Sequence, residues 1–264
     1  MNQQELFVQP EDPRPDVDLS EALVCVSFSG GKDSLAASLY LKRLGIDHVR
    51  LFADTGWEHE TMEAYIESVQ DFVGPVERVA SEGMEALIRK KGMFPSRVRR
   101  FCTQELKIKP LFARMEELAD SSGRELVNVV GVRRQESRAR SKVSEWEWNK
   151  DLDAWTWRPL FDWTEAQVFE EIAKAGAPLN PLYSLGASRV GCWPCIHARK
   201  DEIGLVAVLS PERIALMAEL EAEVEEKQRA RREAAGKPSR LPPRRFRANM
   251  RGEWLYFHIR RIVD

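Results

Sequence analysis

A glycine-rich turn between a predicted strand and a predicted helix sets the first limit on the fold of this chain. The turn is Ser29-Gly30-Gly31-Lys32-Asp33-Ser34, and the apolar run at 22–26 before it is typical of a short buried strand. The run at 35–41 after it has a composition that favours a helix. Backbone N–H groups at a helix start are unpaired, and the helix dipole adds partial positive charge there. Because glycines let an anion approach the backbone and Lys32 adds a full charge, the turn predicts a phosphate-binding loop.

The turn differs from the common P-loop. That motif has glycine at the place of Val26 and serine or threonine at the place of Asp33. The six residues instead resemble the pyrophosphate loop of enzymes that split ATP between its α and β phosphates. The alternative is a glycine turn that carries a surface lysine.

Further strands and helices are predicted to alternate along the chain. Strands are predicted at 49–53, 76–79 and 126–130, and helices at 60–72, 84–90 and 107–118. This alternation predicts an α/β fold, a Rossmann-like parallel sheet flanked by helices. Ligands of such sheets bind beyond the carboxyl ends of the strands. Three segments are expected there: the glycine-rich turn, Asp54-Thr55-Gly56 and Gly131-Val132-Arg133-Arg134.

The 264 residues suit one sizeable domain with an extension. We predict a loose leader at 1–20, a nucleotide-binding α/β domain at 21–200 and a mainly helical, basic extension at 201–264. Ser210 is the expected N-cap, and Pro211 the first residue, of a long helix to about Ala235. No apolar run reaches the length of a membrane span, and the polar, acidic leader is unlike a signal peptide. We therefore expect a cytoplasmic protein without a membrane partner.

Four tryptophans alternate with polar residues in two neighbouring runs. The runs are Glu145-Trp146-Glu147-Trp148 and Ala154-Trp155-Thr156-Trp157, and they predict a hairpin with its tryptophans on one face. A packed cross-strand ladder is one interpretation, and a platform on which nucleic-acid bases stack is the other.

The formal net charge of −2 conceals basic segments. Between Lys227 and Arg261 twelve Lys and Arg residues are opposed only by Glu233 and Glu253. A second basic cluster comprises Lys90, Lys91, Arg97, Arg99 and Arg100. Such an excess of positive charge can bind a polyanion, and the alternative is a solvated helix and tail.

Several motifs together resemble the phosphoadenosine phosphosulfate reductase-like family, which includes ATP pyrophosphatases of DNA phosphorothioation. The motifs are Ser29 to Ser34, Asp54-Thr55-Gly56, the run from Gly131 to Arg138, Arg158 to Thr164, and Asn180-Pro181-Leu182-Tyr183. The resemblance implies an adenine-nucleotide site for ATP. Its binding residues would be Ser27, Phe28, Ser29, Gly30, Gly31, Lys32, Asp33, Ser34, Asp54, Thr55, Gly131, Arg133, Arg134, Ser137 and Arg138.

The resemblance also implies roles for some of these residues. Lys32, Asp33, Arg133 and Arg134 would be catalytic, and Arg138 would join the two arginines at the anionic end of the nucleotide. Guanidinium groups suit phosphate or sulfate oxygens. Asp33 and Asp54 would help to hold Mg²⁺ or would only fix their loops.

Three of the four cysteines lie where iron–sulfur members of the family have cysteines. These are Cys102 and the pair Cys192 and Cys195, whereas Phe101 takes a place that those members give to a further cysteine. Three thiolates could hold a 4Fe–4S cluster with one open iron that carries sulfide. A zinc site completed by His197, or plain thiols, are the alternatives. Cys25 is expected to be an inert core residue.

The reductases of this family carry a catalytic cysteine near their end, whereas no cysteine follows Cys195 here. Without an attacking thiol, direct reduction to sulfite loses its nucleophile. We therefore expect an adenylating sulfurtransferase that activates an acceptor with ATP and takes sulfur from a cysteine desulfurase or another donor. The basic segments favour a nucleic-acid acceptor, as in DNA phosphorothioation or tRNA thiolation. The alternatives are a sulfonucleotide reductase that produces sulfite and a non-catalytic nucleotide-binding subunit.

Overall fold

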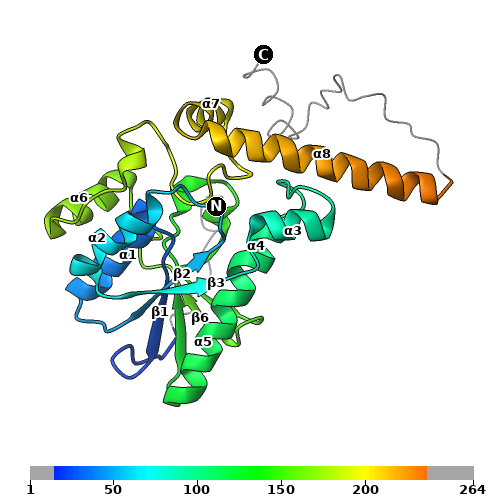
Figure 1. Cartoon of the computed structure of the whole chain (residues 1–264). Helices are drawn as coiled ribbons and strands as arrows, with labels where there is room; N and C mark the ends of the chain where they lie inside the picture. The colour runs from blue at the N-terminus through cyan, green and yellow to red at the C-terminus, as the bar shows by residue number, and fades with distance from the viewer. Residues whose placement is uncertain (1–14, 237–264) are drawn as a thin grey trace, which may run out of the picture. The chain divides into compact units, whose positions relative to one another are not determined.

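The computed structural model describes residues 15–236, which form two compact units (Figure 1). The first unit contains residues 15–53, 61–79 and 110–181, and the second contains residues 54–60, 80–109 and 182–236. The predicted boundaries at residues 20 and 200 stay predictions. Residues 1–14 of the predicted leader and 237–264 of the predicted extension lie outside the described residues.

A six-stranded sheet forms the centre of the first unit, in the order β3-β2-β1-β4-β6-β5. Strand β1 pairs in parallel with β2 and β4, β4 pairs in parallel with β6, and β5 is an antiparallel edge strand. The strands are β1 (Leu23–Ser27), β2 (Val49–Asp54), β3 (Val76–Ala80), β4 (Leu126–Val129), β5 (Trp146–Asn149) and β6 (Ala154–Trp157). This mostly parallel sheet with its helices is Rossmann-like, as predicted.

The helices of the first unit cover both faces of this sheet (Figure 1). They are α1 (Lys32–Arg43), α2 (Met62–Val73), α5 (Lys109–Ser122) and α6 (Glu165–Ala175). Successive side chains of a strand point to opposite faces. Accordingly Cys25 of β1 packs in one core cluster with Met115 of α5, while Val24 packs in another with Leu41 of α1. Cys25 is fully buried, as expected, and burial raises the pKa of its thiol to about 12.

The tryptophan hairpin is confirmed, and its rings form a cross-strand ladder. Trp146 lies opposite Trp157 and Trp148 opposite Trp155. The first pair stacks with ring centroids 5.1 Å apart, and the second meets edge to face at 5.3 Å. Trp146 and Trp157 are buried in the sheet core. The rings are therefore occupied with one another and with the core, which favours the packed-ladder interpretation over a base-stacking platform.

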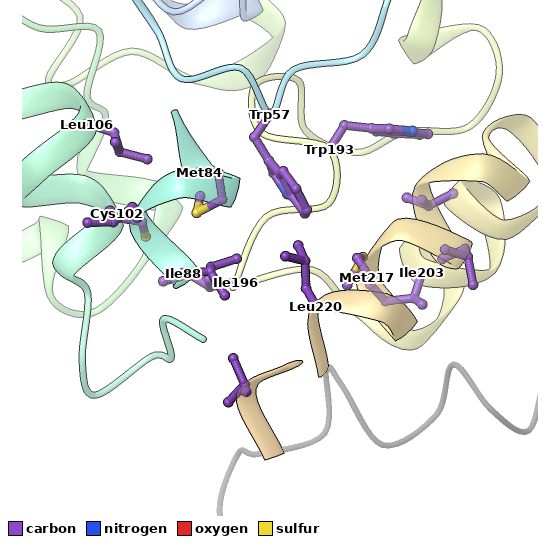
Figure 2. Packing of buried hydrophobic residues seen from close by; sticks show 14 of the residues in the cluster. Trp57, Met84, Ile88, Cys102, Leu106, Trp193, Ile196, Ile203, Met217 and Leu220 are labelled. Atoms are coloured by element: carbon purple, nitrogen blue, oxygen red, sulfur yellow. The ribbon is translucent and has the colours of Figure 1, made fainter. Parts of the chain in front are cut away.

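The second unit is built around helices and loops that share one hydrophobic core (Figure 2). Met84 and Ile88 come from α3 (Met84–Lys91), Ile203 from α7 (Lys200–Leu209), and Met217 and Leu220 from α8 (Pro211–Ala234). A short helix α4 (Phe101–Thr103) is followed by a wider helical turn at Gln104–Ile108. Short 3₁₀ turns span Arg134–Glu136 and Arg140–Lys142, and in addition Pro181–Tyr183.

Helix α8 confirms the long helix predicted after Ser210, but the predicted side-chain cap is absent. Ser210 occupies the N-cap position, yet its hydroxyl accepts a hydrogen bond from Trp193 Nε1 at 3.0 Å. The hydroxyl thus satisfies a buried indole N–H rather than the first turn of the helix. Helix α7 was not predicted, because Gly204 and β-branched Val206 and Val208 weaken its intrinsic helix preference. Burial of Ile203 and Val206 in the core outweighs that preference.

No helix among residues 15–236 combines the length and apolarity that a membrane crossing requires.

Buried His48 makes the stability of the first unit depend on pH. Its Nδ1–H donates to the carbonyl of Ile46 at 2.9 Å, so Nε2 accepts from Ser38 Oγ at 2.7 Å. Burial lowers the pKa of His48 from 6.5 to about 4. The neutral ring therefore contributes stability above pH 6.5, and this contribution is lost as the pH falls through 6.5 toward 4, by at most about 3 kcal/mol.

Urea unfolding of the wild type and His48→Gln at pH 7.5 and pH 4.5 measures this contribution. We expect the wild type to lose more unfolding free energy between the two pH values than the variant. Equal losses of unfolding free energy in the two proteins would show that His48 does not cause the pH dependence.

Candidate functional site

The glycine-rich loop of the first unit is closed by Ser34. Its hydroxyl donates to the carbonyl of Gly31 at 2.9 Å and lies 3.1 Å from both the backbone nitrogen and the hydroxyl of Ser29. The N–H groups of Gly30 and Gly31 have no acceptor among residues 15–236. Free N–H groups at the start of α1 are suited to an anion, as the sequence predicts.

Two glycines are required for this loop to form. Gly30 has φ +72°, and a Cβ there would lie 2.6 Å from Met62 Sδ. A Cβ on Gly131, in the loop after β4, would lie 2.6 Å from the carbonyl oxygen of Asp33 and 2.8 Å from the nitrogen of Ser34. The loop after β4 therefore lies directly against the start of α1.

The charged residues of the loop form a network. Arg133 is 5% exposed and donates from Nε to Asp33 Oδ1 at 2.6 Å. Lys32 Nζ lies 3.5 Å from Asp33 Oδ2 and 3.2 Å from Glu165 Oε1, at the first residue of α6. The structure thus joins Lys32, Asp33 and Arg133 in one network and adds Glu165 to it. Asp33 is engaged by two cations, which fits a loop-fixing role.

The other two predicted arginines are more exposed than Arg133. Arg134 forms an ion pair with Asp162, and its guanidinium carbon lies 4.6 Å from the ring centroid of Phe161. Arg138 is exposed, and its side chain has no partner among the described residues. Ser137 accepts from the backbone N–H of Arg140 at 3.2 Å. Arg134 is held in place, whereas Arg138 is available to a ligand.

Polar side chains link the central strands of the sheet. Ser27 Oγ, at the end of β1, donates to Asn128 Oδ1 at 3.1 Å, and Asn128 Nδ2 donates to Thr156 Oγ1 at 3.4 Å. Asn128 and Thr156 were missed, although a buried asparagine in an apolar strand is a visible signal. Phe28 is 1% exposed, so its side chain is a core residue.

The segment Asp54-Thr55-Gly56 belongs to the second unit and is held by Glu58. The Glu58 carboxylate accepts from the N–H of Thr55 at 3.1 Å and from its hydroxyl at 2.7 Å. Asp54 Oδ1 accepts from the N–H of Gly56 at 2.9 Å. Asp54 therefore fixes its own loop. Glu58 was missed because its role depends on the folded loop.

Three cysteines of the second unit line one cavity of about 170 Å³. They are Cys102 of α4 together with Cys192 and Cys195, which pack against the same core cluster. Cys25 belongs to a different cluster, in the sheet. The cavity is also lined by Thr55, Arg100, Lys107, Arg189 and His197.

Lys107 interacts with Cys192 inside this cavity, and no motif in the sequence indicates that contact. Burial raises the pKa of Cys192, and Lys107 acts in the opposite direction through its charge and a hydrogen bond. Burial also raises the pKa of Cys102. The thiols of Cys102 and Cys192 are therefore protonated at neutral pH, and Cys192 has an ammonium group beside it that favours its thiolate.

The Lys107→Met protein should alkylate more slowly at Cys192 with iodoacetamide at pH 8.5, because loss of the ammonium raises the thiol pKa. Peptide mass spectrometry over time measures the rate at that residue. Lys109→Met is the matched control, since Lys109 pairs with Glu105 at 2.9 Å. Equal alkylation rates at Cys192 in the wild type and both variants would show that Lys107 does not favour the Cys192 thiolate.

Among residues 15–236, no three His, Cys, Asp or Glu side chains are grouped so as to hold a metal ion. A zinc ion needs four ligands at about 2.0–2.3 Å, so the predicted set with His197 is not assembled as a zinc site. A polynuclear cluster holds its thiolates farther apart than one ion does. Cys102, Cys192 and Cys195 share the lining of one cavity, and which metal group they would hold stays a prediction.

Only the first part of the predicted basic segment lies within the described residues. There, Lys227 Nζ donates to the carbonyl of Arg89 at 3.1 Å, from the last part of α8. Arg240, Arg244, Arg245, Arg247, Arg251, Arg260 and Arg261, with Lys237, lie outside the described residues.

Comparison with known proteins gives a match over most of the chain. The profile of the phosphoadenosine phosphosulfate reductase domain matches residues 23–198. A 37.8 kDa protein of Escherichia phage 186 is 34% identical over 74% of this chain and 73% of its own length. A protein of Methanocaldococcus jannaschii is 34% identical over 69% of this chain, which spans 38% of that relative. Adenosine 5′-phosphosulfate reductase of Burkholderia cepacia is 30% identical over 69% of this chain and 66% of its own length.

Proposed function

This chain belongs to the phosphoadenosine phosphosulfate reductase domain family, and from that premise we propose that it is an ATP pyrophosphatase-type, adenylating sulfurtransferase. The observation that carries the proposal is the closed loop from Ser29 to Ser34. It presents the free N–H groups of Gly30 and Gly31 beside buried Lys32, with Arg133 fixed on Asp33. Such a loop binds a chain of phosphates rather than a single charge.

ATP would bind with its phosphates on this loop, and Mg²⁺ would neutralise part of their charge. An oxygen of the acceptor forms a bond to the α phosphorus while the bond from that phosphorus to the bridging oxygen of pyrophosphate breaks. Lys32 stabilises the negative charge on the departing pyrophosphate, and Arg133 and Arg134 stabilise the α-phosphate oxygens. The products of this step are pyrophosphate and an adenylated acceptor.

Sulfur would enter in a second step. A donor sulfur at the oxidation state of sulfide bonds to the activated atom of the acceptor, and AMP leaves with the former acceptor oxygen. Cys102, Cys192 and Cys195 would hold a 4Fe–4S cluster, which when bound supplies a site for sulfide. Lys107 beside Cys192 favours the thiolate state that any metal ligation requires. A cysteine desulfurase is a suitable class of donor, provided that a thiol reductant releases its persulfide sulfur as sulfide and is itself oxidised to a disulfide.

We take nucleic acid as the acceptor class, with DNA phosphorothioation or tRNA thiolation as the reaction. The support is the basic segment that begins at Lys227, together with the cluster near Arg99. Phosphate contacts of this kind provide affinity without sequence information.

A sulfonucleotide reductase is the second candidate. The specific observation in its favour is the 30% identity to adenosine 5′-phosphosulfate reductase of Burkholderia cepacia. The same loop and arginines would bind the sulfonucleotide, and sulfite would be the product.

An isotope experiment separates the two candidates. The protein is purified without oxygen and supplied with Mg²⁺, a cysteine desulfurase, a thiol reductant, ³⁵S-cysteine and either DNA or tRNA. We expect ³⁵S in the nucleic acid only when ATP is present. Sulfite release from adenylyl sulfate or its 3′-phosphate with a thiol reductant, without ³⁵S incorporation, would favour the reductase.

A further inference from the structure

Four exposed arginines lie in the lining of the cysteine cavity of the second unit or on the loop that contributes Arg100 to it. Arg100 and Arg189 line the cavity itself. Arg97 donates from Nη2 to the carbonyl of His197, a lining residue, at 3.5 Å. Arg99 lies between Arg97 and Arg100 in the same loop, and its backbone N–H donates to Ser96 Oγ at 3.1 Å. We call these four residues the arginine rim.

The arginine rim has no carboxylate partner among residues 15–236. Nearby lysines, by contrast, have carboxylate partners. Lys90 pairs with Glu82 at 3.0 Å, and Lys91 and Lys109 both pair with Glu105. Within the described part of the chain the cavity lining also includes no Asp or Glu. Four like charges thus gather around one opening without the compensation that the neighbouring lysines have.

The arrangement of the charges fits a long anion better than a small one. Arg97, Arg99 and Arg100 are all exposed on one loop, and their guanidinium groups have different neighbours: Arg97 donates to the carbonyl of His197, Arg99 donates to Met93 Sδ at 3.6 Å, and Arg100 lines the cavity. Each strand of double-stranded DNA carries a phosphate for about every 3.4 Å of helix axis, so several arginines near one another can each bind a phosphate of the same strand. Val98, in the same loop, is 92% exposed and offers an apolar contact beside the charges.

We propose that the arginine rim binds the phosphodiester backbone of a nucleic-acid chain and holds it across the opening of the cysteine cavity. The proposal deepens the proposed function and rests on it, because it places the acceptor beside the thiols that would deliver sulfur. Guanidinium groups bind phosphate oxygens through paired N–H donors, so arginine suits this role better than lysine.

Binding across a salt series tests the proposal on the full-length protein. Fluorescence anisotropy is measured with single-stranded DNA, duplex DNA and single-stranded RNA of equal length. The test variant is Arg97→Gln/Arg99→Gln/Arg100→Gln. The matched control, Lys42→Gln/Lys109→Gln/Lys174→Gln, removes the same number of positive charges from lysines that lie outside the basic cluster and already have partners, the carbonyl of Phe72, Glu105 and Glu170.

For the wild type we expect affinity to fall steeply with salt. The rim variant should lose affinity more than about tenfold at 50 mM salt, and its slope of log K against log salt should flatten by about 2–3. The control should keep the wild-type slope. Arg189→Gln, on a separate segment of the rim, should flatten the slope by about 1. The oligonucleotide with the highest affinity identifies DNA or RNA as the source of the backbone.

Two results would overturn the proposal. One is an equal slope of log K against log salt for the rim variant and its control. The other is absence of wild-type binding to all three oligonucleotides, which would leave an acidic protein as the partner of the rim. Cleavage of ATP to AMP and pyrophosphate, measured in parallel without nucleic acid, reports on the proposed function separately. If it persists while binding fails, the rim proposal alone is wrong.

Discussion

The Lys32→Ala protein is expected to keep its fold and to cleave ATP at least about 100-fold more slowly than the wild type. Lys32 is 7% exposed and stands at the start of α1 beside the free N–H groups of the loop. Its removal deletes the positive charge beside the N–H groups that we expect to bind the phosphates. Asp33 keeps its 2.6 Å contact with Arg133, so no buried charge is left unpaired.

AMP formation and thermal melting measure the two halves of this expectation. Lys42→Ala is the matched control, because Lys42 lies in the last turn of the same helix and donates to the carbonyl of Phe72. The control should cleave ATP at the wild-type rate. Equal rates for Lys32→Ala and Lys42→Ala would remove Lys32 from the site.

Gly131→Ala should disrupt both the loop and its activity. A Cβ at this position would lie 2.6 Å from the carbonyl oxygen of Asp33, and backbone at that distance has to move. We expect the variant to lose about 1–3 kcal/mol of unfolding free energy, together with most of its ATP cleavage.

Gly204→Ala is the control for Gly131→Ala. Its added Cβ meets nothing within 4 Å, and alanine favours helix α7. This control should therefore be as stable as the wild type or more stable. Urea unfolding compares the three proteins, and an unchanged Gly131→Ala protein would contradict the close approach of the two loops.

Features coded by neighbouring residues were predictable from the sequence. The loop at 29–34 depends on its glycines, and the hairpin at 145–157 depends on tryptophans that alternate with polar residues on either side of a short turn. The structure has both elements. Thr164 caps α6 through Gln167, a signature that also lies within a few residues. Such elements need no knowledge of the rest of the fold.

Residues that act through distant contacts could not be predicted. Lys32 meets Glu165 from a helix that begins 133 positions later, and Lys107 meets Cys192 only after folding. The serine at 210 matched a capping signature, but its hydroxyl was taken by Trp193 in the core. In each of these cases tertiary contacts decided what the side chain does.

The products of ATP cleavage test the central claim most directly. The protein is mixed with Mg²⁺ and ATP labelled with ³²P at the α phosphate, and the nucleotides are separated over time. The account predicts label in AMP or in an adenylated acceptor, with an equal amount of pyrophosphate, and loss of both in Lys32→Ala. Label in ADP with release of phosphate, or no cleavage at any acceptor concentration, would contradict it.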